Sequence, residues 1–148
     1  MHGLILNLLT STCMVVLTVL IHFFGLVLLL RLLAAHSHRV AHFGALMSQI
    51  LMLLTAVLSL IFLHTAEIWS YALLYLALGA LNGFEQALYF STVSFTMLGF
   101  GDIVLDPAFR IISAIEGANG LILFGWSTAF LISLMSKLRM LEHDWLEK

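Results

Sequence analysis

The stretch FEQALYFSTVSFTMLGFGD, residues 84–102, decides how this chain folds. Its first part, residues 84–96, carries apolar and aromatic side chains on every side with small hydroxyls between them, a pattern that predicts a helix buried all round. About thirteen residues at ~1.5 Å each give a length of roughly 20 Å, which is too short to cross a ~30 Å hydrocarbon core. The sequence therefore predicts a helix that enters the membrane and stops.

A segment with alternate glycines follows this short helix. Gly99 and Gly101 flank Phe100, and glycine permits the positive φ angles that most residues avoid. Alternating backbone handedness turns successive carbonyls the same way. Non-helical backbone at membrane depth is tolerated only inside protein or along a water-filled path, so we expect a carbonyl-lined ion passage here. The C-terminal end of the helix, with roughly half a negative charge, favours a cation at the same place.

Residues 89–102, YFSTVSFTMLGFGD, resemble the pore helix and selectivity filter of the potassium channel superfamily, whose usual filter reads Thr-Val-Gly-Tyr-Gly-Asp. The chain looks like a small prokaryotic channel of the two-helix pore type with an extra N-terminal transmembrane helix. The resemblance implies a homotetramer that conducts potassium passively, and a hydrogen bond between Tyr89 and Asp102 that braces the filter. The ion-coordinating residues it implies are Met97, Leu98, Gly99, Phe100 and Gly101, and the supporting residues are Tyr89, Thr96, Asp102 and Glu116.

One position departs from the family pattern. Met97 stands where the family's filter threonine supplies a carbonyl and a hydroxyl to the innermost ion site, and a thioether is a soft ligand for a hard alkali cation. Thr96 cannot substitute without slipping the register of both glycines. Two interpretations stay open. Either Met97 keeps its carbonyl in place and turns its side chain aside, or the inner site is altered and the protein is a non-selective or non-conducting relative.

The composition places the whole chain in a bilayer. Its 148 residues are 62% hydrophobic and 9% charged, with a mean hydropathy of +1.11. A net charge of -2 gives no case for nucleic acid, and a single cysteine, Cys13, allows no intrachain disulfide. The sequence shows no Ser/His/Asp arrangement and no phosphate-binding loop. We therefore expect no enzyme, no small-molecule substrate, no cofactor, and no metal beyond permeant K+.

The fold class that we expect is an all-α integral membrane protein with three transmembrane helices, a re-entrant pore helix and a filter strand. Residues 1–44 should form the N-terminal helix, with an uncharged run over 4–30, and a cytoplasmic loop over 31–44. Residues 66–82 are interpreted as an interfacial segment, because a further crossing there would put the filter on the wrong face. The expected parts of the pore domain, 45–148, are an outer helix 45–64, the interfacial segment 66–82, a pore helix 84–96, the filter 97–101, an inner helix 108–136 and a short cytoplasmic tail.

The charges orient the chain in the cell membrane. By the positive-inside rule, Arg31 and Arg39 place the first loop in the cytoplasm and the N-terminus outside, and basic residues from Lys137 onward mark a cytoplasmic C-terminus. Acidic groups at the outer mouth would concentrate cations. The acidic residues that fall outside or toward it are Glu67, Glu85, Asp102, Asp106 and Glu116.

Several histidines are functional candidates. His22 lies within the first span, where it is either a neutral, hydrogen-bonded side chain at a helix interface or part of a proton relay. His38 and His42 are four residues apart, a spacing compatible with metal binding or with a solvated loop. His22, His36 and His38 make pH a conceivable gating signal. Arginines at repeated three-residue intervals are absent, so we expect no voltage sensor.

Residues 120–129, GLILFGWSTA, resemble the inner, pore-lining helix of the same superfamily. The resemblance implies that Gly120 bends this helix during gating, but both of its glycines can instead serve close helix packing. Glu116, one turn earlier, either pairs with a polar group such as Asn119 behind the filter or faces water at the outer mouth. The gating and pore-lining residues that the resemblance implies are Gly120, Phe124, Gly125, Thr128 and Ile132.

Overall fold

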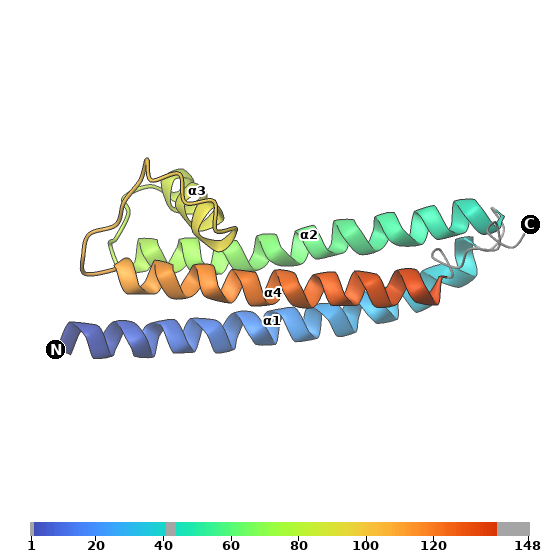
Figure 1. The fold of residues 1–148 in the computed structure, drawn as a ribbon, viewed down its shortest axis with the longest axis horizontal. Helices are drawn as coiled ribbons and strands as arrows, with labels where there is room; N and C mark the ends of the chain where they lie inside the picture. The colour runs from blue at the N-terminus through green and yellow to red at the C-terminus, as the bar shows by residue number, and fades with distance from the viewer. Residues whose placement is uncertain (1, 41–43, 139–148) are drawn as a thin grey trace, which may run out of the picture.

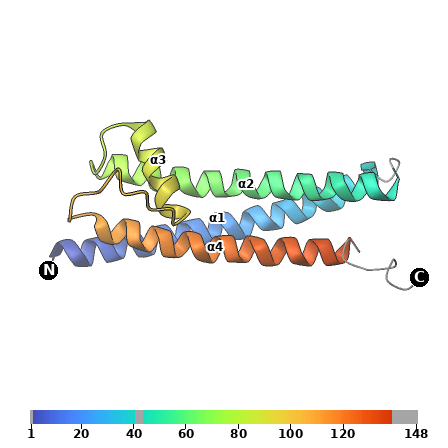
Figure 2. The ribbon, with the colours of Figure 1, turned by 45° about the horizontal axis from the view of Figure 1, so that its top comes forward.

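The computed structural model describes residues 2–40 and 44–138, and these fold as a bundle of helices. Long helices α1 (His2–Val40), α2 (Ala45–Ala77) and α4 (Arg110–Lys137) run side by side, as Figure 1 shows. The short helix α3 (Phe84–Phe95) lies at the end of the bundle where α2 ends and α4 begins, and the start of α1 lies at the same end (Figure 2). The described residues contain no strand, so the all-α expectation is confirmed.

Three helices are long and apolar enough to cross a membrane, as the sequence predicts. The candidate spans are Gly3–Ala35, Leu46–Ala77 and Arg110–Lys137. Each exceeds the roughly 20 residues that a crossing requires. Helix α3, which corresponds to the predicted re-entrant helix, has 12 residues. Among the described helices it is the one that is too short to cross a membrane.

Helix α2 corrects the expected division into an outer helix 45–64 and a separate segment 66–82. One unbroken helix runs from Ala45 to Ala77, because no glycine or proline interrupts its hydrogen bonds before the positive φ of 65° at Gly79. His64 and Glu67, whose polarity marked an exit from the membrane in the sequence, are instead buried between helices. The polar residues within this apolar run therefore mark a helix interface.

Other boundaries differ by less. Helix α1 continues to Val40, so most of the expected loop 31–44 is helical, since this stretch also lacks glycine and proline before Gly44. Helix α3 ends one residue before the predicted 84–96, and α4 starts two residues after the predicted 108. The proposed His38 and His42 pair includes residue 42, which lies outside the described residues, as do Arg139 and Lys148.

The packing of α4 against α3 fixes the position of the short helix. A Cβ added at Gly120 would lie 2.0 Å from the carbonyl oxygen of Phe95, the last residue of α3. Phe95, Ile112 and Leu123 are fully buried in one cluster of core residues. Helix α1 packs on α2 and α4, whereas within the described residues its backbone does not come close to that of α3, and its Cys13 is exposed in the subunit.

We expect Gly120→Ala to lower the free energy of unfolding by about 1–3 kcal/mol, because the new methyl group must push backbone apart. Gly125→Ala is a matched control on the same helix, since a Cβ there meets nothing within 4 Å. Unfolding of both variants in detergent micelles, followed by circular dichroism, measures the difference. Equal stabilities would contradict the close packing of α3 on α4.

Candidate ion-conducting site

The segment after α3 has the backbone alternation that a carbonyl-lined passage requires. Met97, Gly99 and Gly101 have φ angles of 60°, 56° and 77°, so every second residue is left-handed. The segment is not helical, and Leu98 and Phe100 are 60% and 65% exposed on the single subunit. Its backbone therefore lies at the surface of one subunit, where another copy can approach it.

Met97 also has an unusual backbone conformation, which the sequence did not predict. It is the one residue other than glycine that has a positive φ in the described part of the chain. Its backbone N–H donates to the carbonyl of Ser94 at 3.0 Å, and the next N–H, that of Leu98, donates to Val93 at 3.0 Å. A left-handed conformation costs a non-glycine residue about 1–2 kcal/mol, so this turn is held by its surroundings.

The Met97 side chain lies toward α4. A Cβ added at Gly117 would lie 3.7 Å from its Cγ. Thr96 also turns away from the filter, because its hydroxyl donates to the carbonyl of Thr92 within α3 at 2.6 Å. Met97 is also 57% exposed on the single subunit, so both interpretations of position 97 stay open as predictions.

The hydrogen bond that the resemblance implies at the end of the filter is present. The Tyr89 hydroxyl of α3 donates to a carboxylate oxygen of Asp102 at 2.7 Å. This bond to Asp102 raises the pKa of the Tyr89 hydroxyl, because it stabilises the protonated phenol. The brace therefore persists at neutral pH and ties the outer end of residues 97–101 to the helix that precedes them.

Glu116 of α4 is fully buried behind the filter segment. Its carboxylate oxygens lie 2.5 Å from the hydroxyls of Tyr75 in α2 and Ser91 in α3. The expectation that Glu116 pairs with a polar group rather than facing water is confirmed, but the suggested partner Asn119 is wrong. Asn119 points to a different neighbour and donates to Thr18 of α1 at 2.7 Å. One carboxylate thus links α2, α3 and α4.

The residues implied for the inner helix have mixed positions. Helix α4 continues through both glycines, and the contact of Gly120 with α3 supports the packing role rather than a bend. Phe124 lies against the core, with its ring centroid 4.4 Å from that of His64. Gly125, Thr128 and Ile132 are exposed on the subunit, so they remain predicted lining residues.

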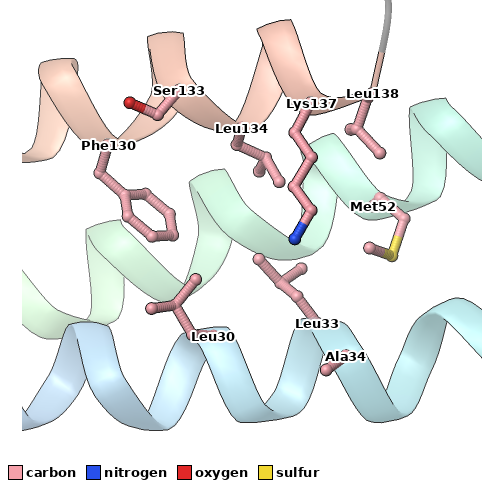
Figure 3. Close-up of a pocket in the computed structure, with 9 residues that line it drawn as sticks. All are labelled: Leu30, Leu33, Ala34, Met52, Phe130, Ser133, Leu134, Lys137 and Leu138. Carbon is pink, nitrogen blue, oxygen red and sulfur yellow. The ribbon is translucent and has the colours of Figure 1, made fainter.

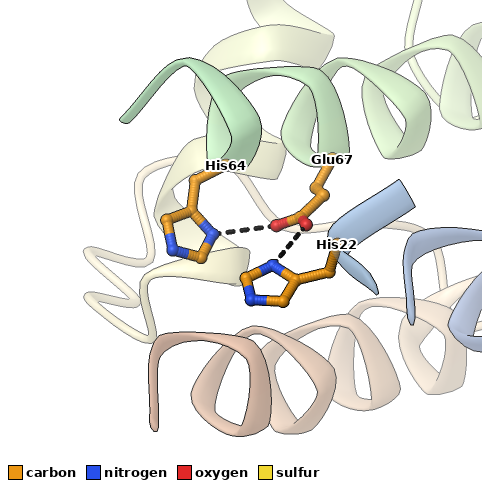
Figure 4. Close-up of side chains that lie close together, drawn as sticks. All are labelled: His22, His64 and Glu67. Atoms are coloured by element: carbon orange, nitrogen blue, oxygen red, sulfur yellow. Dashed lines mark hydrogen bonds and ion pairs between the residues drawn. The ribbon is translucent and has the colours of Figure 1, made fainter. Parts of the chain in front are cut away.

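A second cluster of buried polar side chains was not predicted from the sequence. Figure 4 shows His22 of α1 and His64 of α2 directed at opposite oxygens of Glu67, each at 2.8 Å. His22 and Glu67 are 45 residues apart in the chain. In the sequence, the only sign of this group is that its polar residues stand within apolar runs. Their ligand atoms lie within 4.8 Å of one another, and a metal ion would compete for the same atoms as these hydrogen bonds.

A cavity of about 490 Å³ lies between α1, α2 and α4 at the end of the bundle away from α3. Figure 3 shows the side chain of Lys137 reaching from α4 into a lining that is otherwise almost entirely apolar. Neither the filter segment nor Glu116 contributes to it. The cavity is therefore separate from the candidate site.

Comparison with known proteins relates the chain to one family. Residues 50–137 match a family model described as ion channel, and this match covers more than half of the chain. It includes α3, the filter segment, α4 and most of α2, and it leaves out α1. No match was found among curated proteins or solved structures.

We expect Ser91→Ala to lower the free energy of unfolding by about 1–3 kcal/mol, because it leaves an oxygen of buried Glu116 without its hydroxyl partner. Ser94→Ala on the same helix is the control, since within the described residues its hydroxyl makes no hydrogen bond. Detergent unfolding curves of the two variants provide the test. A Ser91→Ala protein as stable as the control would show that the Glu116 contacts do not hold α3.

Proposed function

Since this chain belongs to the ion channel family, in its two-helix, potassium-channel-like branch, we propose that it is a homotetrameric pore that conducts potassium passively. The observation that carries the proposal is the alternation of left-handed residues at Met97, Gly99 and Gly101. Such alternation lets consecutive carbonyls point to one side, where they can replace the hydration shell of an ion.

The proposed assembly of four copies follows from the small part of the ion's coordination cage that one copy supplies. A single filter segment provides one quarter of a coordination cage, and closed rotational symmetry around its axis provides the rest. The exposed side chains of Leu98 and Phe100 support this, because large apolar groups beside the filter would be covered by neighbouring subunits. The other partner is the lipid bilayer, which covers the outward faces of the spans.

Electrostatics favour cations in the proposed pore. The C-terminal end of α3 carries roughly half a negative charge, and only the C-cap residue Thr96 separates it from Met97. Asp102 at the far end of the filter segment is exposed, so its carboxylate can attract cations before entry. Ions would then move down their electrochemical gradient through the carbonyls of residues 97–101.

The charged ends of the bundle support the proposed orientation in the cell membrane. Arg31 and Lys137 lie toward the end away from α3, and Glu85 and Asp102 lie at the filter end, where Arg110 is an exception. By the positive-inside rule, the filter end faces outward. The start of α1 lies at that same end, so the N-terminus would be outside and the C-terminus cytoplasmic.

Ion flux into liposomes that contain the pure protein tests the proposal. We expect potassium flux to exceed sodium flux by more than about tenfold, a discrimination of about 1.4 kcal/mol. Gly99→Ala should abolish the flux, because alanine is strained at a φ of 56°. Gly3→Ala is the control, since a Cβ at this α1 position meets nothing within 4 Å. Absence of flux in the wild-type protein would favour a non-conducting relative.

Met97 motivates a second candidate function, a non-selective cation pore. Without the threonine hydroxyl, the innermost ion site would have only its carbonyl oxygens. We expect Met97→Thr to increase the ratio of potassium to sodium flux at least several-fold, because the hydroxyl adds a hard oxygen ligand. Leu98→Val, which adds no such oxygen, serves as the control in the same assay. Equal ratios in wild type and Met97→Thr would show that position 97 does not set selectivity.

A further inference from the structure

A closed cycle of polar contacts joins α1, α2 and α4 in the middle of the bundle. Glu67 accepts from Nδ1 of His22 and Nδ1 of His64, each at 2.8 Å (Figure 4). Nε2 of His64 lies 3.0 Å from the Ser127 hydroxyl, and Nε2 of His22 lies 3.5 Å from the same oxygen. We call these four residues the polar cycle. All four side chains are buried, with His22 and Glu67 fully so.

The number of protons in the polar cycle follows from which atoms can donate. An ionised Glu67 only accepts, so both Nδ1 atoms must carry hydrogen. The Ser127 hydroxyl has one hydrogen, which it donates to one Nε2, so it must accept from the other. One imidazole therefore carries hydrogen on both nitrogens. Two neutral histidines and one ionised carboxylate are therefore one hydrogen short. All four contacts are satisfied only when the polar cycle binds one additional proton.

This proton also balances the charge of the buried cycle. One carboxylate and one imidazolium have a net charge of zero, and transfer of the proton to Glu67 gives the same count. With one proton fewer, two acceptors face each other and a buried negative charge remains. With one more, both imidazoles donate to Ser127 and a positive charge remains. Either state is costly in apolar surroundings.

Among the described residues, the side chains around the polar cycle supply no other charge. Trp126 of α4 lies 5.1 Å from the His22 ring, and Phe124 of α4 and Phe95 of α3 lie 4.4 and 6.0 Å from the His64 ring. Within the described residues, the next titratable groups along the same interface are Tyr71 and Glu116. These two have their own partners, Asn119 for Tyr71 and the pair Tyr75 and Ser91 for Glu116.

We propose that the polar cycle is a binding site for a single proton and that the bound proton holds α1 to α2 and α4. His22 belongs to α1, which lies outside the residues that match the ion channel family. The site therefore attaches the additional helix to the channel domain. This proposal does not depend on ion conduction, and its test uses protein stability, so the two proposals can fail separately.

A proton fits the cycle better than a metal ion. The ligand atoms of His22, His64 and Glu67 are close enough to surround a divalent ion. A divalent ion with one carboxylate would leave a positive charge in an apolar, buried site, whereas one proton leaves none. A metal ion is therefore an alternative that the experiment must distinguish.

Glu67→Gln provides a closely matched test. The glutamine amide can donate to one Nδ1 and accept from the other, so all four contacts close with both histidines neutral and no additional proton. Above pH ~6.5 an unfolded chain releases the histidine proton that the folded wild type keeps, so wild-type stability must fall as pH rises. The unfolding equilibrium constant of the wild type should rise about tenfold per pH unit relative to that of Glu67→Gln.

Unfolding curves in mixed detergent micelles between pH ~6.5 and ~9 measure this difference. Ser133→Ala, at an exposed serine of α4, should retain the pH dependence of the wild type. Parallel pH dependences in wild type and Glu67→Gln would overturn the proposal, and so would stabilisation of the wild type by zinc with no dependence on protons.

A direct measurement covers the case in which a variant does not fold. In nitrogen-15 spectra of histidine-labelled wild-type protein at pH ~8, solvated histidines are neutral. We expect one side chain with both nitrogens protonated, and its signal should disappear in His22→Gln. A spectrum in which every histidine is neutral, together with a carbon-13 spectrum in which Glu67 is ionised, would overturn the proposal without any comparison of stabilities.

Discussion

The contact between Gly120 of α4 and the carbonyl oxygen of Phe95 constrains the rest of the structure. A helix of 12 residues cannot cross the membrane, so its last carbonyls end at depth and must lie inside protein. Glycine at position 120 allows α4 to pass directly behind that end. Because α4 lies so close, the chain can turn at Met97 and run back outward as the non-helical segment 97–101.

Buried hydrogen bonds reinforce this arrangement in layers about one turn apart. His64 and Glu67 form one layer on α2, Tyr71 forms the next, and Tyr75 forms the third, beside α3. Each layer includes a partner from α4, and the first two include one from α1. Since lipid removes most of the hydrophobic drive for helices to associate, these polar contacts specify which helix faces meet.

The backbone of residues 97–101 and its hydrogen bond to α3 could be predicted from sequence because they depend on local chemistry. Alternate glycines fix the backbone at 99 and 101, and Tyr89 and Asp102 are close in the chain, so their bond follows from the family pattern. The positions of His64 and Glu67 could not be predicted in this way. Their partners His22 and Ser127 are 45 and 63 residues away, and in a single sequence a polar residue in an apolar run resembles a membrane exit. The left-handed backbone of Met97 could not be predicted either, because methionine has no preference for a positive φ.

The lone cysteine of the sequence has a practical consequence. Cys13 lies on α1 and is exposed in the subunit. A nitroxide attached to its thiol would place one paramagnetic centre on every copy without any engineered residue. Dipolar spectroscopy would then count the copies in a native particle, since four centres around a rotation axis give two distances in the ratio of a square's diagonal to its side.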